Sequence, residues 1–310
     1  MMEVATKHTV RHELKKNGLL YLMFLPVGLY FLVLAYVPMP GIVVAFKSFT
    51  YDGGIFGSKW NGFENFRYFI ESGKLLLVTG NTLFYNLVFL GLSTVVAICA
   101  GVLVAEMTGT FFKKLAQSFM FLPYFISWVT VSAFMYNLFN YDYGVINHFI
   151  RSLGGTPFNF YAEPDAWLVL LPLLYVWKGV GFSSVLYLSA IMGIDQECYE
   201  SAYIDGANVF QRIRHITLPM LKPTVITLTL LGLSRIMRGE FDMFYQIIGD
   251  NGFLLDRTDI IDTLVFRSLV STNDFGMASS AGFYQSVLCF VIIMGVNTFL
   301  RRKHPEYALF

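Results

Sequence analysis

The side chains that could carry metal or covalent chemistry are scattered along this chain of 310 residues. Its histidines form no set of metal ligands, because only His8 and His12 lie close together in sequence and no H-E-x-x-H sequence occurs. The histidines are His8, His12, His148, His215 and His304. Cys99, Cys198 and Cys289 are too far apart in sequence to indicate a disulfide framework or a metal site. We therefore expect no catalytic residue and no metal ligand.

A nucleotide site is also not expected in this chain. Gly73-Lys74 is followed by Leu75 and has no glycine five residues earlier, so it does not form the phosphate-binding Walker A sequence. The net charge is +1, which gives no basic field for nucleic acid. The chemistry to be expected is therefore non-covalent binding.

The polar segment at residues 196–218 lies between long apolar runs. Asp205-Gly206 suits the end of one short helix, and Asp205 can cap the next one. Tyr199, Tyr203, Gly206 and Phe210 have the spacing of one helical face. The exposed acid Glu200 is placed to pair with an arginine of a partner. The same features also fit an amphipathic loop at the membrane surface with no partner.

The end of this segment predicts how it joins the next apolar run. Pro219 disfavours helical geometry at Leu218. Pro219 can itself occupy the first turn of a helix. We therefore expect a short helix attached rigidly to a membrane helix that begins at Pro219.

The composition places the chain in a membrane. Hydrophobic residues make up 55% and charged residues 14%, against about 25% charged residues in a soluble domain. Six apolar runs are each long enough to cross a bilayer, and only helices or closed barrels satisfy the backbone there. They span residues 18–37, 83–107, 116–139, 167–192, 219–237 and 281–300. This predicts an all-α integral membrane protein with six transmembrane helices, kinked where Pro26, Pro123 and Pro172 lie inside spans.

The first apolar run is expected to be a retained helix. It is too long for a typical signal peptide and lacks a clear small-x-small cleavage site.

Basic residues set the expected orientation, because cytoplasmic loops are enriched in lysine and arginine. In a six-helix chain the basic clusters all lie on one side: Lys7, Arg11, Lys15, Lys16, Lys113, Lys114, Arg212, Arg214, Arg301, Arg302 and Lys303. We therefore expect both termini and the 196–218 segment in the cytoplasm.

The 196–218 segment and the residue after it resemble the "EAA" loop of ABC importer permeases, whose pattern is E-A-A-x-x-D-G-A, a gap, and I-x-L-P. The residues in register are Glu200, Ala202, Asp205, Gly206, Ala207, Ile216, Leu218 and Pro219. Ser201 replaces the usual first alanine and Ile213 stands where an aromatic is common. Both departures keep helix compatibility. We name residues 196–218 the EAA-like loop.

The resemblance covers most of the chain. Residues 63–66 with 80–83, 121–123, and 241–278 are also similar to this family. The chain is identified as similar to type I permeases of the carbohydrate and oligosaccharide uptake group, most like the polysaccharide-type permeases of Gram-positive bacteria. This implies a multi-pass protein of the bacterial cell membrane that is not itself an enzyme.

The resemblance also implies a domain plan. A cytoplasmic tail covers residues 1–17, and the first transmembrane helix with an extracytoplasmic loop covers residues 18–80. The permease core covers residues 81–300 and contains the coupling loop 196–218 between helices 4 and 5. A cytoplasmic tail covers residues 301–310.

The implied partners supply what this chain lacks. They are a second homologous permease, an ABC ATPase dimer that binds ATP and magnesium, and an extracytoplasmic sugar-binding lipoprotein. The residues implied to couple to the ATPase are Glu200, Ser201, Ala202, Tyr203, Asp205, Gly206, Ala207, Phe210, Leu218 and Pro219.

Aromatic and amide side chains at membrane depth are the candidates to contact a sugar, which needs hydroxyl partners and flat apolar faces. The candidates are Tyr85, Asn86, Tyr124, Trp128, Asn137, Trp177, Lys178, Asp242, Tyr245, Gln246, Tyr284 and Gln285. Each can instead be an interfacial residue or an interhelix hydrogen bond. A mid-span lysine costs roughly 2.5–3.5 kcal/mol on insertion scales, so Lys178 should face a wet cavity or pair with Glu240 or Asp242.

Two other classes of function remain open. A permease for glycerol phosphate or a peptide would have the same plan, although an anionic solute favours several buried cations and only Lys178 and Arg235 fall clearly within spans. A six-helix membrane enzyme or sensor would need a catalytic constellation or an added soluble domain, and the sequence shows neither.

Overall fold

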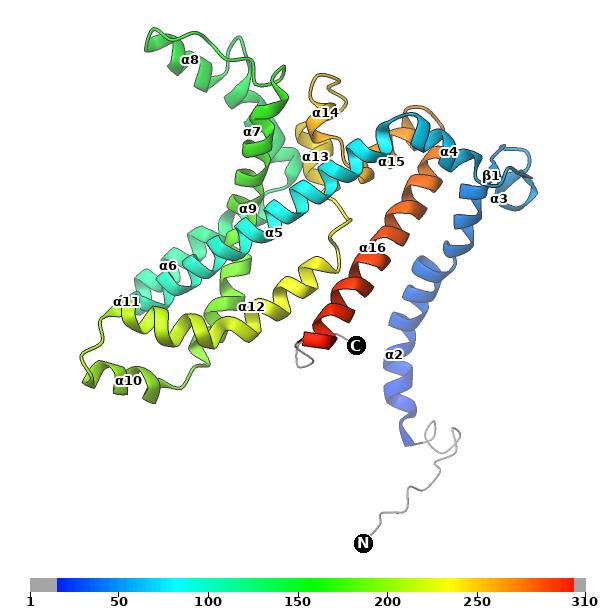
Figure 1. Ribbon diagram of the computed structural model, residues 1–310. Coiled ribbons are helices and arrows are strands. Elements are labelled where there is room, and N and C mark those ends of the chain that lie inside the picture. The colour runs from blue at the N-terminus through cyan, green and yellow to red at the C-terminus, as the bar shows by residue number, and fades with distance from the viewer. Residues whose placement is uncertain (1–15, 304–310) are drawn as a thin grey trace.

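The structure, a computed structural model, describes residues 16–303 and is almost entirely helical (Figure 1). In the described residues one antiparallel hairpin pairs β1 (Lys47–Ser48) with β2 (Lys59–Trp60). Lys7, Arg11 and Lys15 and the end of the C-terminal tail lie outside the described residues, and so do the expected positions of both termini.

The helices follow one another along the chain with short connections. The first half contains α2 (Gly18–Phe31), the π-helix η1 (Leu32–Tyr36), the 3₁₀-helix η2 (Met39–Phe46), α3 (Gly54–Gly57), α4 (Glu64–Glu71), α5 (Lys74–Glu106), α6 (Thr110–Phe121), the 3₁₀-helix η3 (Leu122–Phe125), α7 (Trp128–Phe139) and α8 (Val145–Ser152). The second half contains α9 (Pro164–Met192), α10 (Gln196–Ile204), α11 (Val209–Arg212), the π-helix η4 (Ile213–Thr217), α12 (Leu218–Leu233), α13 (Phe241–Ile247), α14 (Leu255–Thr258), α15 (Ile261–Val270) and α16 (Phe275–Lys303).

Five described helical stretches are long and apolar enough to cross a bilayer, and a sixth is a broken pair. The five are Gly18–Phe46, Lys74–Glu106, Pro164–Met192, Val209–Leu233 and Phe275–Lys303. The prediction of six spans is met when the broken pair counts as one. Several spans are longer than predicted: the second begins at Lys74 rather than residue 83, and the sixth at Phe275 rather than residue 281.

The third predicted span, residues 116–139, is not one helix. The stretches Thr110–Phe125 and Trp128–Phe139 meet at an angle of 91°. Pro123 lies in the 3₁₀ turn just before the break, where its missing N–H and its ring interrupt helical bonding. Ser127 then begins α7, because its side chain accepts a hydrogen bond from the Thr130 N–H at 3.2 Å. The bend predicted at Pro123 is confirmed, and at 91° it divides the span into two helices.

The long helices α5 and α9 pack closely along their length and form the centre of the molecule (Figure 1). Small residues make this approach possible, as is common between membrane helices. A Cβ atom on Gly101 would lie 3.1 Å from the Ser184 carbonyl oxygen of α9. Tyr85, Phe89 and Trp167 fill the core beside these helices with α7 and α13. By contrast, α2 has no buried residue, so in the membrane its apolar surface must be covered by lipid or by another chain.

Gly181 gives a direct test of this packing. A Cβ atom at Gly181 would overlap the Met120 carbonyl, whereas one at Gly179 on the same helix meets nothing within 4 Å. Gly181→Ala should therefore destabilise the protein by about 1–3 kcal/mol, while Gly179→Ala should leave it unchanged or slightly more stable. Thermal unfolding of the two variants in the same detergent measures this. Equal melting temperatures would contradict the close approach of α9 to residues 120–121.

Candidate functional site

The EAA-like loop begins with α10, which ends in a well-formed Schellman turn. Gly206 has a φ of +80°, the left-handed conformation that glycine adopts without strain. The Ala207 N–H donates to the Ala202 carbonyl at 2.9 Å, and the Gly206 N–H donates to the Tyr203 carbonyl at 3.0 Å. The prediction that Asp205-Gly206 ends a short helix is confirmed.

The residue that caps the next helix differs from the prediction. Asn208, not Asp205, begins α11: its side chain accepts from the Gln211 N–H at 2.9 Å, and the Gln211 side chain accepts from the Asn208 N–H at 2.8 Å. This reciprocal pair is a capping box. Asp205 is the C-cap residue of α10, and its N–H donates to the Ser201 carbonyl, so it is not placed to cap α11.

The membrane helix after the loop begins at Val209, not at Pro219. Leu218 has φ −64° and ψ −43°, which is helical, so the predicted non-helical geometry at Leu218 is wrong. The π-helix η4 explains the difference, because the Leu218 N–H donates to Ile213, five residues earlier. This wider turn accommodates the ring of Pro219 and leaves no helical bond that Pro219 would have to donate. The result is one continuous helix over Val209–Leu233.

Two side-chain contacts tie the loop to the membrane helices. The Tyr199 hydroxyl lies 2.9 Å from the Thr217 hydroxyl, which joins α10 to η4. Arg212 of α11 lies 3.7 Å from Glu106 at the end of α5. Tyr199, Arg212 and Glu106 border a cavity of about 310 Å³ between the loop and the core.

The predicted single face of Tyr199, Tyr203, Gly206 and Phe210 is wrong, because the turn at Gly206 separates two helices. Tyr199 faces inward to Thr217, while Tyr203 and Phe210 are 73% and 82% exposed. The other predicted coupling residues Glu200, Ser201, Asp205, Gly206, Leu218 and Pro219 are exposed, and Ala202 and Ala207 are half-buried. The loop therefore presents aromatic and acidic groups outward from a turn that is fixed on its inner side.

The second candidate site lies at the other end of the same helix, where α12 stops at Leu233 and the chain is non-helical over residues 234–240. Side chains from three other elements form hydrogen bonds with backbone groups that have no helical partner. Asn86 donates to the Ile236 carbonyl at 2.9 Å, and Gln285 donates to the Met237 carbonyl at 2.6 Å. The Asp262 carboxylate accepts from the Gly239 N–H at 2.8 Å and from Gln285 at 3.0 Å.

A cavity of about 310 Å³ borders this segment, at mid-height of α5. Non-helical backbone at membrane depth is tolerated where protein buries it or where it lines a water-filled cavity. The cavity is lined by Asn86, Phe89, Leu90, Ser93, Tyr175, Gly232, Arg235, Ile236, Arg238, Gly239 and Glu240. A polar, charged cavity of this size at a break in a membrane helix can hold a small polar molecule.

Lys178 does not pair with Glu240 or Asp242 as predicted: neither carboxylate lies within ion-pair distance of it in the part of the chain that the structure describes. Its ammonium donates to the Tyr124 carbonyl at 2.8 Å and lies 5.5 Å and 5.3 Å from the rings of Tyr124 and Trp128. Glu240 acts on it only over a longer range. The sharp bend after Pro123 thus brings a carbonyl and two aromatic faces to this lysine.

The remaining predicted pathway residues are not gathered in one place. Tyr85 is 1% exposed, and its hydroxyl has no hydrogen-bond partner among the described residues. Tyr284 is held against α5 by a 3.2 Å contact with the Thr79 hydroxyl. Trp177 and Asn137 are exposed on α9 and α7, and Asp242, Tyr245 and Gln246 follow one another on α13.

The sequence reasoning omitted Arg238 and Asp262. A usable signal was present, because residues 235–240 place three charges and a glycine directly after an apolar run.

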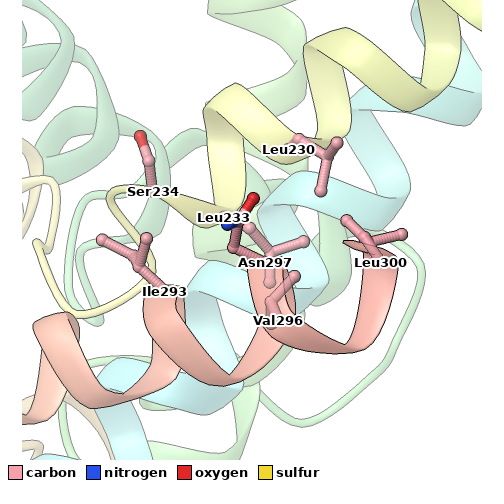
Figure 2. Close-up of a pocket in the computed structure, with 7 residues that line it drawn as sticks. All are labelled: Leu230, Leu233, Ser234, Ile293, Val296, Asn297 and Leu300. Carbon is pink, nitrogen blue, oxygen red and sulfur yellow. The ribbon is translucent and has the colours of Figure 1, made fainter. Parts of the chain in front are cut away.

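A further crevice between α12 and α16 is a packing gap rather than a binding site. Figure 2 shows it lined by apolar side chains of both helices, together with Ser234 and the amide of Asn297. Its volume is about 10 Å³, which is no more than one water molecule requires.

Comparison with known proteins identifies the family. Residues 97–304 match the family described as the binding-protein-dependent transport system inner membrane component. The chain belongs to this family. It is therefore a permease subunit and a multi-pass protein of the bacterial cell membrane.

Relatives of this permease include two Bacillus subtilis proteins. The chain is 31% identical over 297 residues to Protein LplB, covering 96% of this chain and 92% of LplB. It is also 31% identical over 298 residues to the polygalacturonan/rhamnogalacturonan transport system permease protein YteP, with the same coverage.

Solved structures with the same fold include two of a bacterial alginate ABC transporter. One, described as involved in the import of the acidic polysaccharide alginate, superposes with a TM-score of 0.85 at 29% identity and covers 95% of this permease and 99% of that chain. The other is a complex with an alginate pentasaccharide-bound periplasmic protein and gives a TM-score of 0.83 at 29% identity, covering 94% and 96%.

The bonds that hold residues 234–240 predict a stability effect. Asn86→Ala leaves the Ile236 carbonyl without its donor and should cost about 1–3 kcal/mol. Asn137→Ala is the matched control, because the Asn137 amide bonds only to a carbonyl of its own helix and is exposed. Thermal unfolding in detergent measures both variants, and a melting temperature of Asn86→Ala equal to that of Asn137→Ala would show that the segment does not depend on this bond.

Proposed function

We propose that this permease is the transmembrane subunit of an ATP-driven, binding-protein-dependent ABC importer for a carbohydrate, and that it forms half of the translocation pathway. The observation that carries the proposal is the continuous helix Val209–Leu233. One end of it bears the EAA-like loop, and the other ends at the polar cavity. A partner that moves the loop therefore also moves a wall of the cavity.

Other subunits would supply the energy and the substrate. A second homologous permease completes the pathway, and the unburied apolar surface of α2 is available to it. An ABC ATPase dimer binds ATP and magnesium beneath the EAA-like loop, since this chain has no Walker A sequence. A solute-binding lipoprotein delivers sugar from outside, as the periplasmic protein does in the alginate transporter complex.

The proposed orientation puts the EAA-like loop and both termini in the cytoplasm. Lys113, Lys114, Arg212 and Arg214 lie at one end of the helices. The outer connection between α7 and α9 carries one basic residue, Arg151. This asymmetry is the one expected of cytoplasmic loops.

The proposed mechanism is alternating access. ATP binding closes the ATPase dimer and moves the EAA-like loop, which carries Val209–Leu233 with it. Residues 234–240 then act as the joint at which the cavity changes the side to which it opens, and hydrolysis resets the loop. The permease supplies two states and a path, while ATP supplies direction.

Sugar is preferred over glycerol phosphate or a peptide because of the order of similarity. The relatives at 31% identity include one named for polygalacturonan and rhamnogalacturonan, while an sn-glycerol-3-phosphate permease of Pectobacterium atrosepticum is 25% identical. A membrane enzyme or sensor finds no support in the family match.

The loop can be tested with a pair of glycine variants. Gly206 and Gly154 both have positive φ and open space at the Cβ position, but Gly154 lies in the connection between α8 and α9. Both variants to arginine carry a similar backbone strain of about 1–2 kcal/mol. Gly206→Arg should abolish co-purification of the ATPase with the permease pair, and Gly154→Arg should retain it.

The outcome separates docking from folding. Size-exclusion chromatography of each variant shows whether the permease itself is intact. If a well-folded Gly206→Arg permease retains its ATPase, or if the wild type binds none, the coupling role of the loop is refuted.

A further inference from the structure

We infer that the imported carbohydrate is acidic, and that Arg235 and Arg238 bind its carboxylate groups in the cavity beside residues 234–240. This inference deepens the proposed function and rests on it, because it names the class of sugar that the cavity accepts. It starts from the two arginine side chains that the sequence reasoning did not place together.

The first step is that both arginines lie at the cavity without a carboxylate partner. Arg235 and Arg238 line the same cavity of about 310 Å³. Within the described residues, neither guanidinium forms an ion pair or a side-chain hydrogen bond; the ion pairs involve Arg67, Arg212, Arg257 and Arg267 instead. Charged residues at membrane depth are costly and mark substrate paths when they face a wet cavity.

The second step is the charge of the lining. Arg235, Arg238 and Glu240 are its ionic residues, so the lining carries a net charge of +1. The positive charges of Lys178 and Arg235 both act on Glu240, and the negative charge of Glu240 offsets one of these two positive charges. Two further acids, Asp242 and Asp262, also act on Glu240, and Asp242 has the largest effect of these four charges. Asp262 accepts from the Gly239 N–H and from Gln285, and the charge of Arg238 also acts on it. Within the described residues Asp262 forms no ion pair with either arginine, so both guanidinium groups keep their N–H donors for a ligand.

The third step is geometry that suits a sugar ring with a carboxylate. A guanidinium group presents paired N–H donors that match a carboxylate, which an ammonium group does not. On the same cavity wall, the rings of Phe89 and Tyr175 stack at 4.2 Å and 11°. Phe89 is 2% exposed, so the half-buried ring of Tyr175, held in place by this stacking, is the apolar surface beside the charges. Such a surface suits the C–H face of a sugar ring, while the arginines hold the acidic substituent.

Sequence reasoning weighed against anionic solutes because only Lys178 and Arg235 fell within apolar runs. The structure brings Arg238 to the same cavity, which gives the site a pair of guanidinium groups. An acidic oligosaccharide satisfies both the charge and the stacked aromatic surface. A small anion such as glycerol phosphate uses the charge alone.

The test uses the complete importer, with its binding protein and ATPase, in proteoliposomes. The probes are galacturonate oligomers, the same oligomers with their carboxyl groups methyl-esterified, and neutral maltose oligomers. ATP-dependent uptake is compared for wild type, Arg235→Gln, Arg238→Gln and Arg238→Lys. Arg67→Gln is the control, since Arg67 is an exposed arginine of α4 paired with Glu71.

We expect uptake of the galacturonate oligomers by wild type, with KM raised about tenfold by each glutamine variant, the change that corresponds to about 1.4 kcal/mol for a charge-assisted hydrogen bond. Arg238→Lys keeps the positive charge and should recover part of the loss. Arg67→Gln should leave KM unchanged. Equilibrium binding of a labelled galacturonate pentamer to the complex without its binding protein should show the same order.

Two different failures can be told apart. If the importer takes up only esterified or maltose oligomers, or if the glutamine variants leave the KM for galacturonate oligomers unchanged, the acidic-substrate inference is overturned and the importer proposal stands. If no sugar of either class is taken up in an ATP-dependent way by an assembled complex, the proposed function itself is overturned.

Discussion

The central constraint on this structure is that the backbone groups at the break over residues 234–240 must be paired. In a lipid environment unpaired N–H and C=O groups are costly, and the end of α12 leaves several of them. They are bonded by Asn86 of α5, Asp262 of α15 and Gln285 of α16. Three elements far apart in sequence must therefore meet at this point. These side chains stabilise the non-helical form of residues 234–240, and the cavity lies beside that segment.

The second constraint is mechanical and lies at the other end of the same helix. The stretch Val209–Leu233 has 25 residues, which corresponds to roughly 35–40 Å at the helical rise. It thus extends across most of a bilayer without interruption. The Schellman turn at Gly206 and the capping box at Asn208 fix the direction in which α10 leaves it. In the proposed mechanism, a displacement of α10 is passed on to the cavity through this one continuous helix.

Much of this organisation could be predicted from the sequence, because it depends on composition and local turn chemistry. The apolar runs, the turn at Asp205-Gly206 and the break near Pro123 are all determined by residues close in sequence. The continuous helix through Leu218-Pro219 could not be predicted, since a π turn five residues long overrides the local preference of the residue before proline. Arg238 was missed for another reason: its place beside Arg235 and Tyr175 depends on how α5 and α9 pack against the break.

The π turn of η4 joins the two constraints. A helix broken at Leu218 would leave α10 attached through a flexible joint, and its movement would be lost before it reached the membrane. With η4 in place, Pro219 lies inside the continuous helix, and the hydroxyl of Thr217, which is 2% exposed, lies 2.9 Å from the Tyr199 hydroxyl within the same turn. The contact that anchors α10 is thus made to the element that keeps the helix continuous. In the proposed mechanism, loosening η4 would uncouple α10 from residues 234–240 while leaving both intact.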